Sequence, residues 1–306
     1  MTVTAALVKE LREKSGAGML DCKKALEENN GDIDAAMDFL RAKGLASAAK
    51  KSSRAAAEGL VSVAADGATG IAIELNAETD FVARNEQFQS FLNKLTDTAL
   101  AQKADDVEAL KKLDLGGKTA EAHLTELIAN IGENMTLRRA KLLSVTNGVV
   151  SSYVHNALQP GRGKIGVLVA LESTGDAAKL DALGRQLAMH IAAARPEALD
   201  VESMDPDLVA RERAVYVEKA KESGKPAEIV EKMVEGSMRK FYEQSVLLQQ
   251  TFIIDGESKI SAVLEAAAKD VGAPVKLASY VRFELGEGVE KKEDDFASEV
   301  AKMAAG

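Results

Sequence analysis

The sequence has 306 residues, of which 46% are hydrophobic and 28% charged, the balance of an ordinary soluble protein rather than a disordered one. A chain of this length is expected to form about two or three compact units. The net charge of −9 argues against a general nucleic-acid binder, because neutralising phosphates requires a clustered basic surface. We therefore expect no direct contact with nucleic acid.

Two further features predict a cytoplasmic protein without membrane contact. No segment approaches the roughly 20 apolar residues of a membrane span, and residues 1–15 lack the apolar centre of a signal peptide. The single cysteine, Cys22, excludes an internal disulfide and a multi-thiolate metal site, in agreement with a reducing compartment. Because Cys22 lies in a helix-like segment, we interpret it as a small buried apolar residue rather than a nucleophile.

The amino-terminal part is predicted to contain three short helices, at residues 5–14, 20–28 and 33–43. Asp32 or Asp34 is suited to cap the third helix. So small a bundle has little core, which favours a recognition module over a catalytic domain. The basic segment that follows, KGLASAAKKSSR at 43–54, is interpreted as a solvated, flexible linker in preference to an RNA contact.

The pattern then changes to the alternation typical of strands. Residues 60–63 and 71–75 predict a hairpin that turns at Asp66-Gly67. Helices are expected at about 86–101 and 120–130, and a strand at 135–144.

This arrangement is repeated further along the chain. Residues 149–154 and 165–171 predict a second hairpin, and GIAIEL at 70–75 aligns with GVLVAL at 166–171. Likewise IGENMTLRR at 131–139 resembles VGAPVKLAS at 271–279, and each segment opens a closing strand. The sequence therefore predicts an α+β protein with two related subdomains, at about 55–145 and 146–286.

The second copy is longer because it contains an insertion. Residues 206–222 and 226–245 are strongly helical and are separated by SGKP, which predicts an antiparallel helical hairpin. A projecting helix pair is typical of an interaction or dimerisation arm, and a simple packing layer is the alternative.

No group of residues predicts an enzyme, a resident cofactor or a metal centre. His123, His155 and His190 stand in separate segments, and His190 is interpreted as a structural residue of an apolar helix. The segment GRGK at 161–164 lacks the spacing of a phosphate-binding loop and is interpreted as a hairpin loop. The scattered carboxylates are interpreted as solvated surface; they are Glu126, Glu133, Asp205 and Asp207.

An unusual aromatic turn, TDFV, follows the first hairpin. It contains Thr79, Asp80, Phe81 and Val82, in a chain with only 8 Phe, 4 Tyr and no Trp. One interpretation is that Thr79 or Asp80 caps the next helix while Phe81 packs into its own subdomain. The other is that Phe81 is an exposed anchor for a partner's pocket, with Asp80 bringing charge to a metal or phosphate site of that partner. Composition leaves both open.

Several motifs resemble the bacterial elongation factor Ts family, the guanine-nucleotide exchange factors of elongation factor Tu. They run along almost the whole chain and are LVKELREKSGAGMLDCKKAL, NGDIDAA, ETDFVARNEQF, IGVLVAL, AMHIAA with RPEAL, SGKPAEIVEKMVEGSMRKF and VRFELGEGVEK. The resemblance implies a ubiquitin-associated-like docking domain with linker at 1–54, and two core subdomains at 55–145 and 146–286. It also implies a helical arm at about 206–245 and a carboxy-terminal module at 287–306.

The resemblance also implies site residues. Phe81 would wedge beside the nucleotide pocket of elongation factor Tu, while Asp80, in the turn Thr79–Val82, would help displace the elements that hold magnesium. Amino-terminal contacts would fall on Arg12, Met19 and Leu20, the last standing where the family pattern has a second Met. His155 matches a histidine that reaches another domain of the partner, although the loop 156–164 after it is longer than usual.

The expected activity is therefore nucleotide exchange without covalent chemistry. The protein would bind elongation factor Tu in its GDP-bound and nucleotide-free states, and the helical arm could form a homodimer. The main alternative is an adaptor whose arm drives assembly, which predicts that a Phe81→Ala variant keeps all activity. An enzyme with an unfamiliar site is the third hypothesis, which turnover of a small molecule would support.

Overall fold

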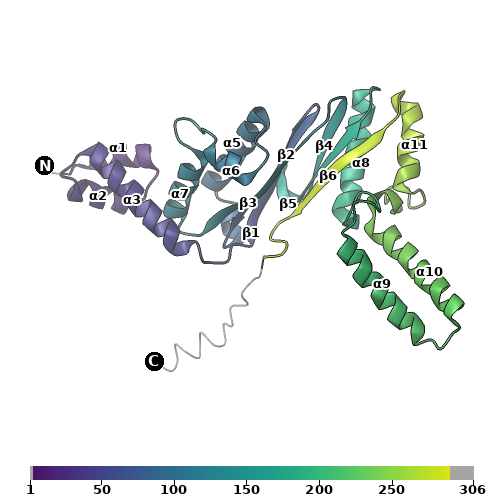
Figure 1. Ribbon diagram of the computed structural model, residues 1–306. Coiled ribbons are helices and arrows are strands. Elements are labelled where there is room, and N and C mark those ends of the chain that lie inside the picture. Colours follow the sequence, from purple (N-terminus) through teal and green to yellow (C-terminus); the bar gives the residue numbers. More distant parts are fainter. Residues whose placement is uncertain (1–2, 290–306) are drawn as a thin grey trace.

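The computed structural model describes residues 3–289, and its first three helices form a separate bundle at one end of the molecule (Figure 1). They are α1 (Ala5–Ser15), α2 (Met19–Glu28) and α3 (Ile33–Lys51). Asp32 caps α3 by accepting a hydrogen bond from the Ala35 N–H at 3.0 Å. Cys22 is fully buried in the bundle core beside Leu11 and Leu26, which confirms its interpretation as a structural residue.

The predicted flexible linker at 43–54 is wrong, because α3 continues through it to Lys51. This segment is rich in Ala and Lys, which favour helix, and Lys50 and Lys51 lie where cations stabilise the end of a helix. It also packs against α7 (Ala120–Ile131): a Cβ atom on Gly44 would lie 3.4 Å from that of Ala129. The connection between bundle and core is therefore a packed helix.

The first half of the core contains the predicted hairpin, helices and closing strand. Strands β1 (Glu58–Asp66) and β2 (Thr69–Ala77) pair antiparallel, and β3 (Met135–Ser144) pairs with the other edge of β2. Between them lie α4 (Asp80–Ala83), α5 (Glu86–Gln102), α6 (Val107–Lys112) and α7. The sequence did not predict α6, a six-residue helix in which only Leu110 is buried.

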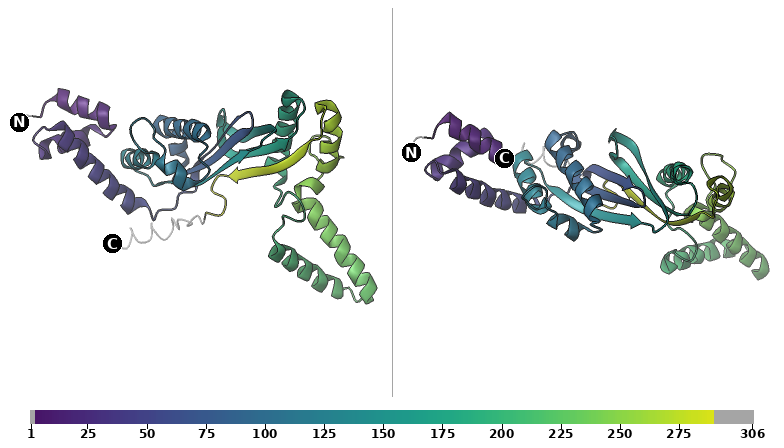
Figure 2. Two further views of the ribbon diagram at one scale, coloured as in Figure 1. Left: turned by 45° about the horizontal axis from the view of Figure 1, so that its top comes forward. Right: turned by 90° about the horizontal axis from the view of Figure 1, so that it is seen from above.

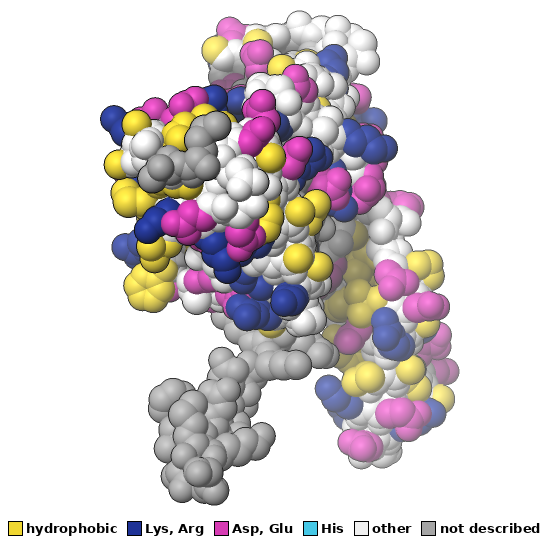
Figure 3. Space-filling model, turned by 90° about the vertical axis from the view of Figure 1, so that its left-hand side faces the viewer, with side chains coloured by type: hydrophobic (Ala, Val, Ile, Leu, Met, Phe, Trp, Pro, Cys, Tyr) yellow, Lys and Arg dark blue, Asp and Glu magenta, His cyan; other side chains and the backbone are white. Residues whose placement is uncertain are grey.

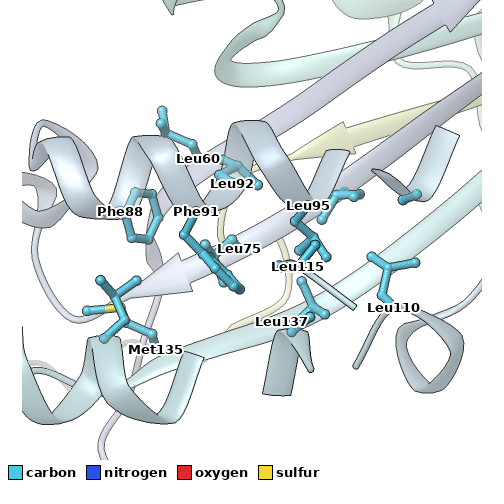
Figure 4. Close-up of a cluster of buried hydrophobic side chains, with 14 of the residues drawn as sticks. Leu60, Leu75, Phe88, Phe91, Leu92, Leu95, Leu110, Leu115, Met135 and Leu137 are labelled. Atoms are coloured by element: carbon cyan, nitrogen blue, oxygen red, sulfur yellow. The ribbon is translucent and has the colours of Figure 1, made fainter. Parts of the chain in front are cut away.

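Side chains from α5, α6 and α7 cover one face of these strands. Phe88 and Leu92 of α5 are fully buried, and Figure 4 shows them in one cluster that also contains leucines of the strands and Leu110 of α6. Burying an aromatic or leucine side chain contributes about 1.5–3 kcal/mol, so this cluster is a major source of stability for the half that carries the TDFV turn.

The second half repeats the arrangement. Strand β5 (Arg162–Glu172) lies between β4 (Gly148–Gln159) and β6 (Lys276–Glu284), as β2 lies between β1 and β3. Helices α8 (Ala177–Ala194) and α11 (Ile260–Val271) cover its outer face, with the short 3-10 helix η1 (Leu247–Gln249) between them. GRGK lies at a hairpin as predicted, but only its Gly161 belongs to the turn, which it forms with Pro160; Arg162 already pairs with Gln159. The long loop at 156–164 is instead an extension of both strands, with an irregularity between Ala157 and Gln159.

The two halves pack face to face and also share one sheet. Their strands join where Val61 and Ser62 of β1 pair with Gly163 and Arg162 of β5. Apolar side chains from both halves meet between the faces, and at this contact Gly166 leaves no room for a side chain, since its Cβ atom would lie 2.6 Å from Val61. Helices therefore lie on the two outer sides of the core (Figures 1 and 2).

The predicted helical hairpin is confirmed. Helices α9 (Pro206–Lys221) and α10 (Ala227–Ser245) run side by side and project away from the core in all ribbon views (Figures 1 and 2). Asp205 caps α9, and Ala220, Val234 and Met238 are buried between the two helices. Of the predicted carboxy-terminal module at 287–306, residues 290–306 lie outside the described residues.

Candidate functional site

The TDFV turn forms α4, a helix of one turn that presents two side chains to solvent and buries two others. Val82 and Ala83 face the core and are 3% and 7% exposed, whereas Phe81 is 79% exposed. Of the described large hydrophobic side chains only Leu20, at 83%, is more exposed. The interpretation in which Phe81 packs into its own subdomain is therefore wrong. A large aromatic side chain that is exposed to solvent, on a turn whose other side is anchored in the core, is typical of a residue that contacts another protein.

The residues that follow Phe81 hold the turn from its carboxyl side. Asn85 caps α5 by accepting hydrogen bonds from the N–H groups of Gln87, at 2.8 Å, and Phe88, at 3.3 Å. The predicted cap on this helix by Thr79 or Asp80 is therefore wrong. Gln89 donates a further hydrogen bond to the Ala83 carbonyl at 2.9 Å. The turn is thus tied to the start of the long buried helix α5.

Glu133 holds the turn from its amino side, and sequence reasoning missed this role. One oxygen of its carboxylate accepts a hydrogen bond from the Thr79 N–H at 2.9 Å, and the other accepts one from the Thr79 hydroxyl at 2.7 Å. The interpretation of Glu133 as solvated surface is therefore wrong. A signal was available, because the repeat aligns Glu133-Asn134 with the apolar pair Ala273-Pro274, and only the first copy has the TDFV turn.

Asp80 completes the exposed part of the turn. It is the first residue of α4 and lies beside Phe81 on the solvent side. Within residues 3–289 its carboxylate has no hydrogen-bond or ion-pair partner. A carboxylate in this position remains available to a cation or a hydrogen-bond donor of another molecule.

A second exposed apolar pair lies in the amino-terminal bundle. Met19 and Leu20 begin α2 and are 60% and 83% exposed, and Arg12 is exposed near the end of α1. The Gly16 N–H donates to the Arg12 carbonyl and its left-handed backbone (φ 68°) ends α1, so the chain turns between Arg12 and the two apolar residues. Figure 3 shows hydrophobic side chains among charges of both signs on this end of the molecule. Apolar residues surrounded by charges are typical of a protein-binding surface.

His155 lies apart from the other predicted contact residues. It is exposed on β4, which pairs only with β5 and so forms an edge of the sheet within the described chain. Its Nδ1 atom lies 3.2 Å from the hydroxyl oxygen of Tyr153, which limits the orientation of the ring. An imidazole held in this way can offer its other nitrogen to a partner.

His190, by contrast, has partners within the fold. His190 is fully buried: its Nε2 atom lies 2.9 Å from Oε1 of Gln250, and its Nδ1 accepts a hydrogen bond from the Ile253 N–H at 3.3 Å. Burial lowers the pKa of this imidazole, and its structural interpretation is confirmed. Among residues 3–289 no cluster of three His, Cys, Asp or Glu residues could hold a metal ion. None of the helices in that range is long and apolar enough to cross a membrane.

A mixed α+β core with two exposed apolar regions is typical of a protein that binds another protein, and comparison with known proteins identifies its family. The family model described as "Elongation factor TS" matches residues 78–287. Proteins named elongation factor Ts from Rhodospirillum centenum and Caulobacter vibrioides are 62% and 56% identical to this chain, and the matches cover 99% and 98% of it and of each relative. The chain belongs to the elongation factor Ts family, and its class is that of the translation elongation factors.

Proposed function

We propose that this protein is a guanine-nucleotide exchange factor that promotes the release of GDP from elongation factor Tu. Membership of the elongation factor Ts family supports this partner. The observation that carries the proposal is the exposure of Phe81, 79%, on a turn that is hydrogen-bonded on both sides. Such a turn can enter a pocket without first becoming ordered, which lowers the entropy cost of binding.

The proposed mechanism is a wedge. Magnesium and a phosphate-binding loop hold GDP through strong charge interactions in a partly dehydrated site, so GDP leaves slowly. Phe81 enters beside this site, and Asp80 brings a negative charge that disturbs the groups holding magnesium. The partner is then stabilised in a distorted, magnesium-free form with low affinity for GDP.

Thermodynamic linkage makes this effect on affinity reciprocal. If the exchange factor weakens GDP binding by some factor, GDP weakens binding of the exchange factor by the same factor. Couplings of about 1–3 kcal/mol, or roughly 5- to 150-fold, are typical, and an efficient exchange factor requires more. Abundant GTP then fills the empty site and displaces the exchange factor, so equilibration is accelerated without any covalent bond being made or broken.

The remaining contact residues increase affinity and fix orientation. Arg12, Met19 and Leu20 dock the amino-terminal bundle on the partner, while His155 contacts a different domain of it. Because these residues lie outside the TDFV turn, they raise the occupancy of the complex without acting on the nucleotide. The protein itself needs no cofactor for this activity, which takes place in the cytoplasm with the rest of translation.

The test measures the release of a fluorescent GDP analogue from purified elongation factor Tu by stopped flow. The native chain is expected to accelerate release strongly, and Phe81→Ala is expected to lose most of that acceleration. Ile254→Ala is the matched control, because Ile254 is 48% exposed but lies on a different loop. Equal acceleration by the native chain and Phe81→Ala would move the mechanism away from the wedge. A folded native chain without any effect would reject exchange and favour an adaptor role for the arm.

A further inference from the structure

The loop after α7 carries a carboxylate that is directed at the base of the TDFV turn. We infer that Glu133 is a positioning residue for the wedge: it holds Thr79 and thereby fixes the direction in which Phe81 projects. This inference rests on the proposed exchange function. It assigns Glu133 an indirect role, through Thr79, instead of a contact with the partner's nucleotide.

The two hydrogen bonds from Thr79 to Glu133 restrain both the backbone and the side chain of Thr79. The Thr79 N–H and hydroxyl lie 2.9 and 2.7 Å from the two carboxylate oxygens. Hydrogen bonds to an ionised acceptor are shorter and stronger than neutral ones, and two of them define an orientation. Glu133 itself is half-buried and directly follows Gly132, whose left-handed backbone (φ 90°) ends α7.

The turn needs this restraint because α4 has little stability of its own. A helix of four residues is far below the length at which helix is stable in water. Thr79 occupies the position before this helix, where a hydroxyl commonly accepts hydrogen bonds from the first turn, yet in the described chain it makes no such bond. Its hydroxyl is directed to Glu133 instead. The Thr79 side chain, which in this position would ordinarily cap α4, therefore attaches α4 to the loop after α7.

The neighbouring residues strengthen the attachment. Asn134, which is 4% exposed, donates its backbone N–H to the Glu78 carboxylate at 2.5 Å and its side-chain amide to the Arg54 carbonyl at 2.7 Å. The guanidinium of Arg54 lies 3.4 Å from the same Glu78 carboxylate. Two successive residues of the loop thus hold two successive residues, Glu78 and Thr79, immediately before the wedge.

The internal repeat offers an independent indication that this clamp serves the wedge. The second copy aligns Ala273-Pro274 with Glu133-Asn134, and neither of those side chains can accept a hydrogen bond. Both loops follow a glycine that ends a helix and both lead into the closing strand, so the fold does not require polar residues there. The polar pair occurs in the copy that presents Phe81 to solvent.

The inference predicts a specific loss in the exchange assay. Glu133→Ala is expected to reduce the GDP-release rate, at subsaturating concentration, by about tenfold, which corresponds to about 1.4 kcal/mol. Glu133→Gln is expected to stay within about twofold of the native rate, because its amide oxygen can accept from the Thr79 N–H and its amide nitrogen can donate to the hydroxyl. Glu126→Ala is the matched control, since Glu126 lies on α7 and pairs with Lys118 at 2.7 Å instead.

The decisive measurement is the double variant. If Glu133 acts through Phe81, then Glu133→Ala added to Phe81→Ala should cause no further loss, whereas a general structural defect should reduce the rate in both backgrounds. Thermal unfolding of each variant shows whether the chain is folded at the assay temperature. If Glu133→Ala is unfolded there, Thr79→Val takes its place, because it removes one of the two hydrogen bonds with little change of volume.

The outcomes separate this inference from the proposed function. If the native chain accelerates release and Phe81→Ala does not, but folded Glu133→Ala equals the native chain, the positioning role is rejected and exchange stands. An equal additional loss in the Phe81→Ala background also rejects the positioning role. If the folded native chain has no effect, both the exchange function and the inference fail.

Discussion

The backbone N–H of Gly286 donates a hydrogen bond of 2.8 Å to the carboxylate of Glu74, a residue 212 positions earlier in the chain. Glu74 lies on β2 and has no exposed surface. Arg138 and Arg139 of β3 also bind it, at 3.1 and 2.5 Å. One buried carboxylate therefore joins two strands of the first half to the segment that leaves β6 of the second half.

Glu74→Ala is expected to lower the free energy of unfolding by about 3 kcal/mol. Removing one partner of a buried ion pair leaves charges and donors without compensation, and here four donors lose the same acceptor, since the Asn76 amide also donates to Glu74 at 3.1 Å. Urea unfolding followed by circular dichroism measures the loss. Glu265→Ala is the control, because exposed Glu265 lies on α11 and its removal should change stability by less than about 0.5 kcal/mol. A loss below about 1 kcal/mol for Glu74→Ala would show that the network does not hold the halves together.

Local patterns in the sequence predicted the hairpins, the helical arm and the α+β class, since alternation and helical spacing act within a few residues. Long-range partners were not predictable in this way. Glu74 and Glu133 resemble surface carboxylates in the sequence, and only the fold shows that one is buried among arginines and the other binds Thr79. The extension of α3 to Lys51 was missed because its Ala-Lys composition is typical of linkers as well as helices, and its contact with α7 decides between them.

The candidate site, too, was predictable from the sequence only in part. The position of Phe81 after a strand was visible in the sequence, but its exposure depended on which way the turn faces the core, and Val82 and Ala83 determine that by being buried. The resemblance to a family indicated the residues proposed to contact the partner, whereas the residues that hold the TDFV turn in place were found only in the structure.

Stability is expected to fall on the acid side of neutrality because of His190. Burial lowers the pKa of His190 in the folded protein below the value of about 6.5 for an unfolded chain. The unfolded state therefore binds the proton more readily: the contribution of His190 is fully present above about pH 6.5 and decreases as pH falls towards the lowered folded pKa. One such group gives a slope of at most about 1.4 kcal/mol per pH unit.

Urea unfolding between pH 5 and 8 would measure this slope in the native chain and in His190→Gln, which cannot titrate. The variant is expected to be less stable at neutral pH but to have a flatter dependence. His155→Gln serves as the control because His155 is exposed, and its profile should follow the native one. Equal slopes in the native chain and His190→Gln would assign the acid sensitivity to other groups.

Leu20→Ala is expected to weaken binding to elongation factor Tu without slowing exchange at saturation. Truncating an exposed anchor commonly costs about 1–2 kcal/mol of binding free energy, or roughly 5- to 30-fold in Kd. Since Leu20 is proposed to dock and not to wedge, excess protein should restore the full rate. Titration of exchange rate against concentration separates the two parameters, and Leu45→Ala, at a residue 55% exposed on α3, is the control. A lower rate at saturation would contradict a purely docking role.

Asp80→Asn is expected to impair exchange in a manner that depends on magnesium. The proposed task of Asp80 is to disturb the groups that hold the metal, so the variant should be slower, by about five- to tenfold, only while magnesium is bound. When a chelator removes the metal, that step is already complete, and the native chain and variant should release GDP at equal rates. Measuring release over a series of free magnesium concentrations tests this, with Asp66→Asn, at an exposed residue that ends β1, as the control. A ratio of native to variant rates that stays constant across the series would mean that Asp80 contributes to binding alone, leaving Phe81 to distort the nucleotide pocket.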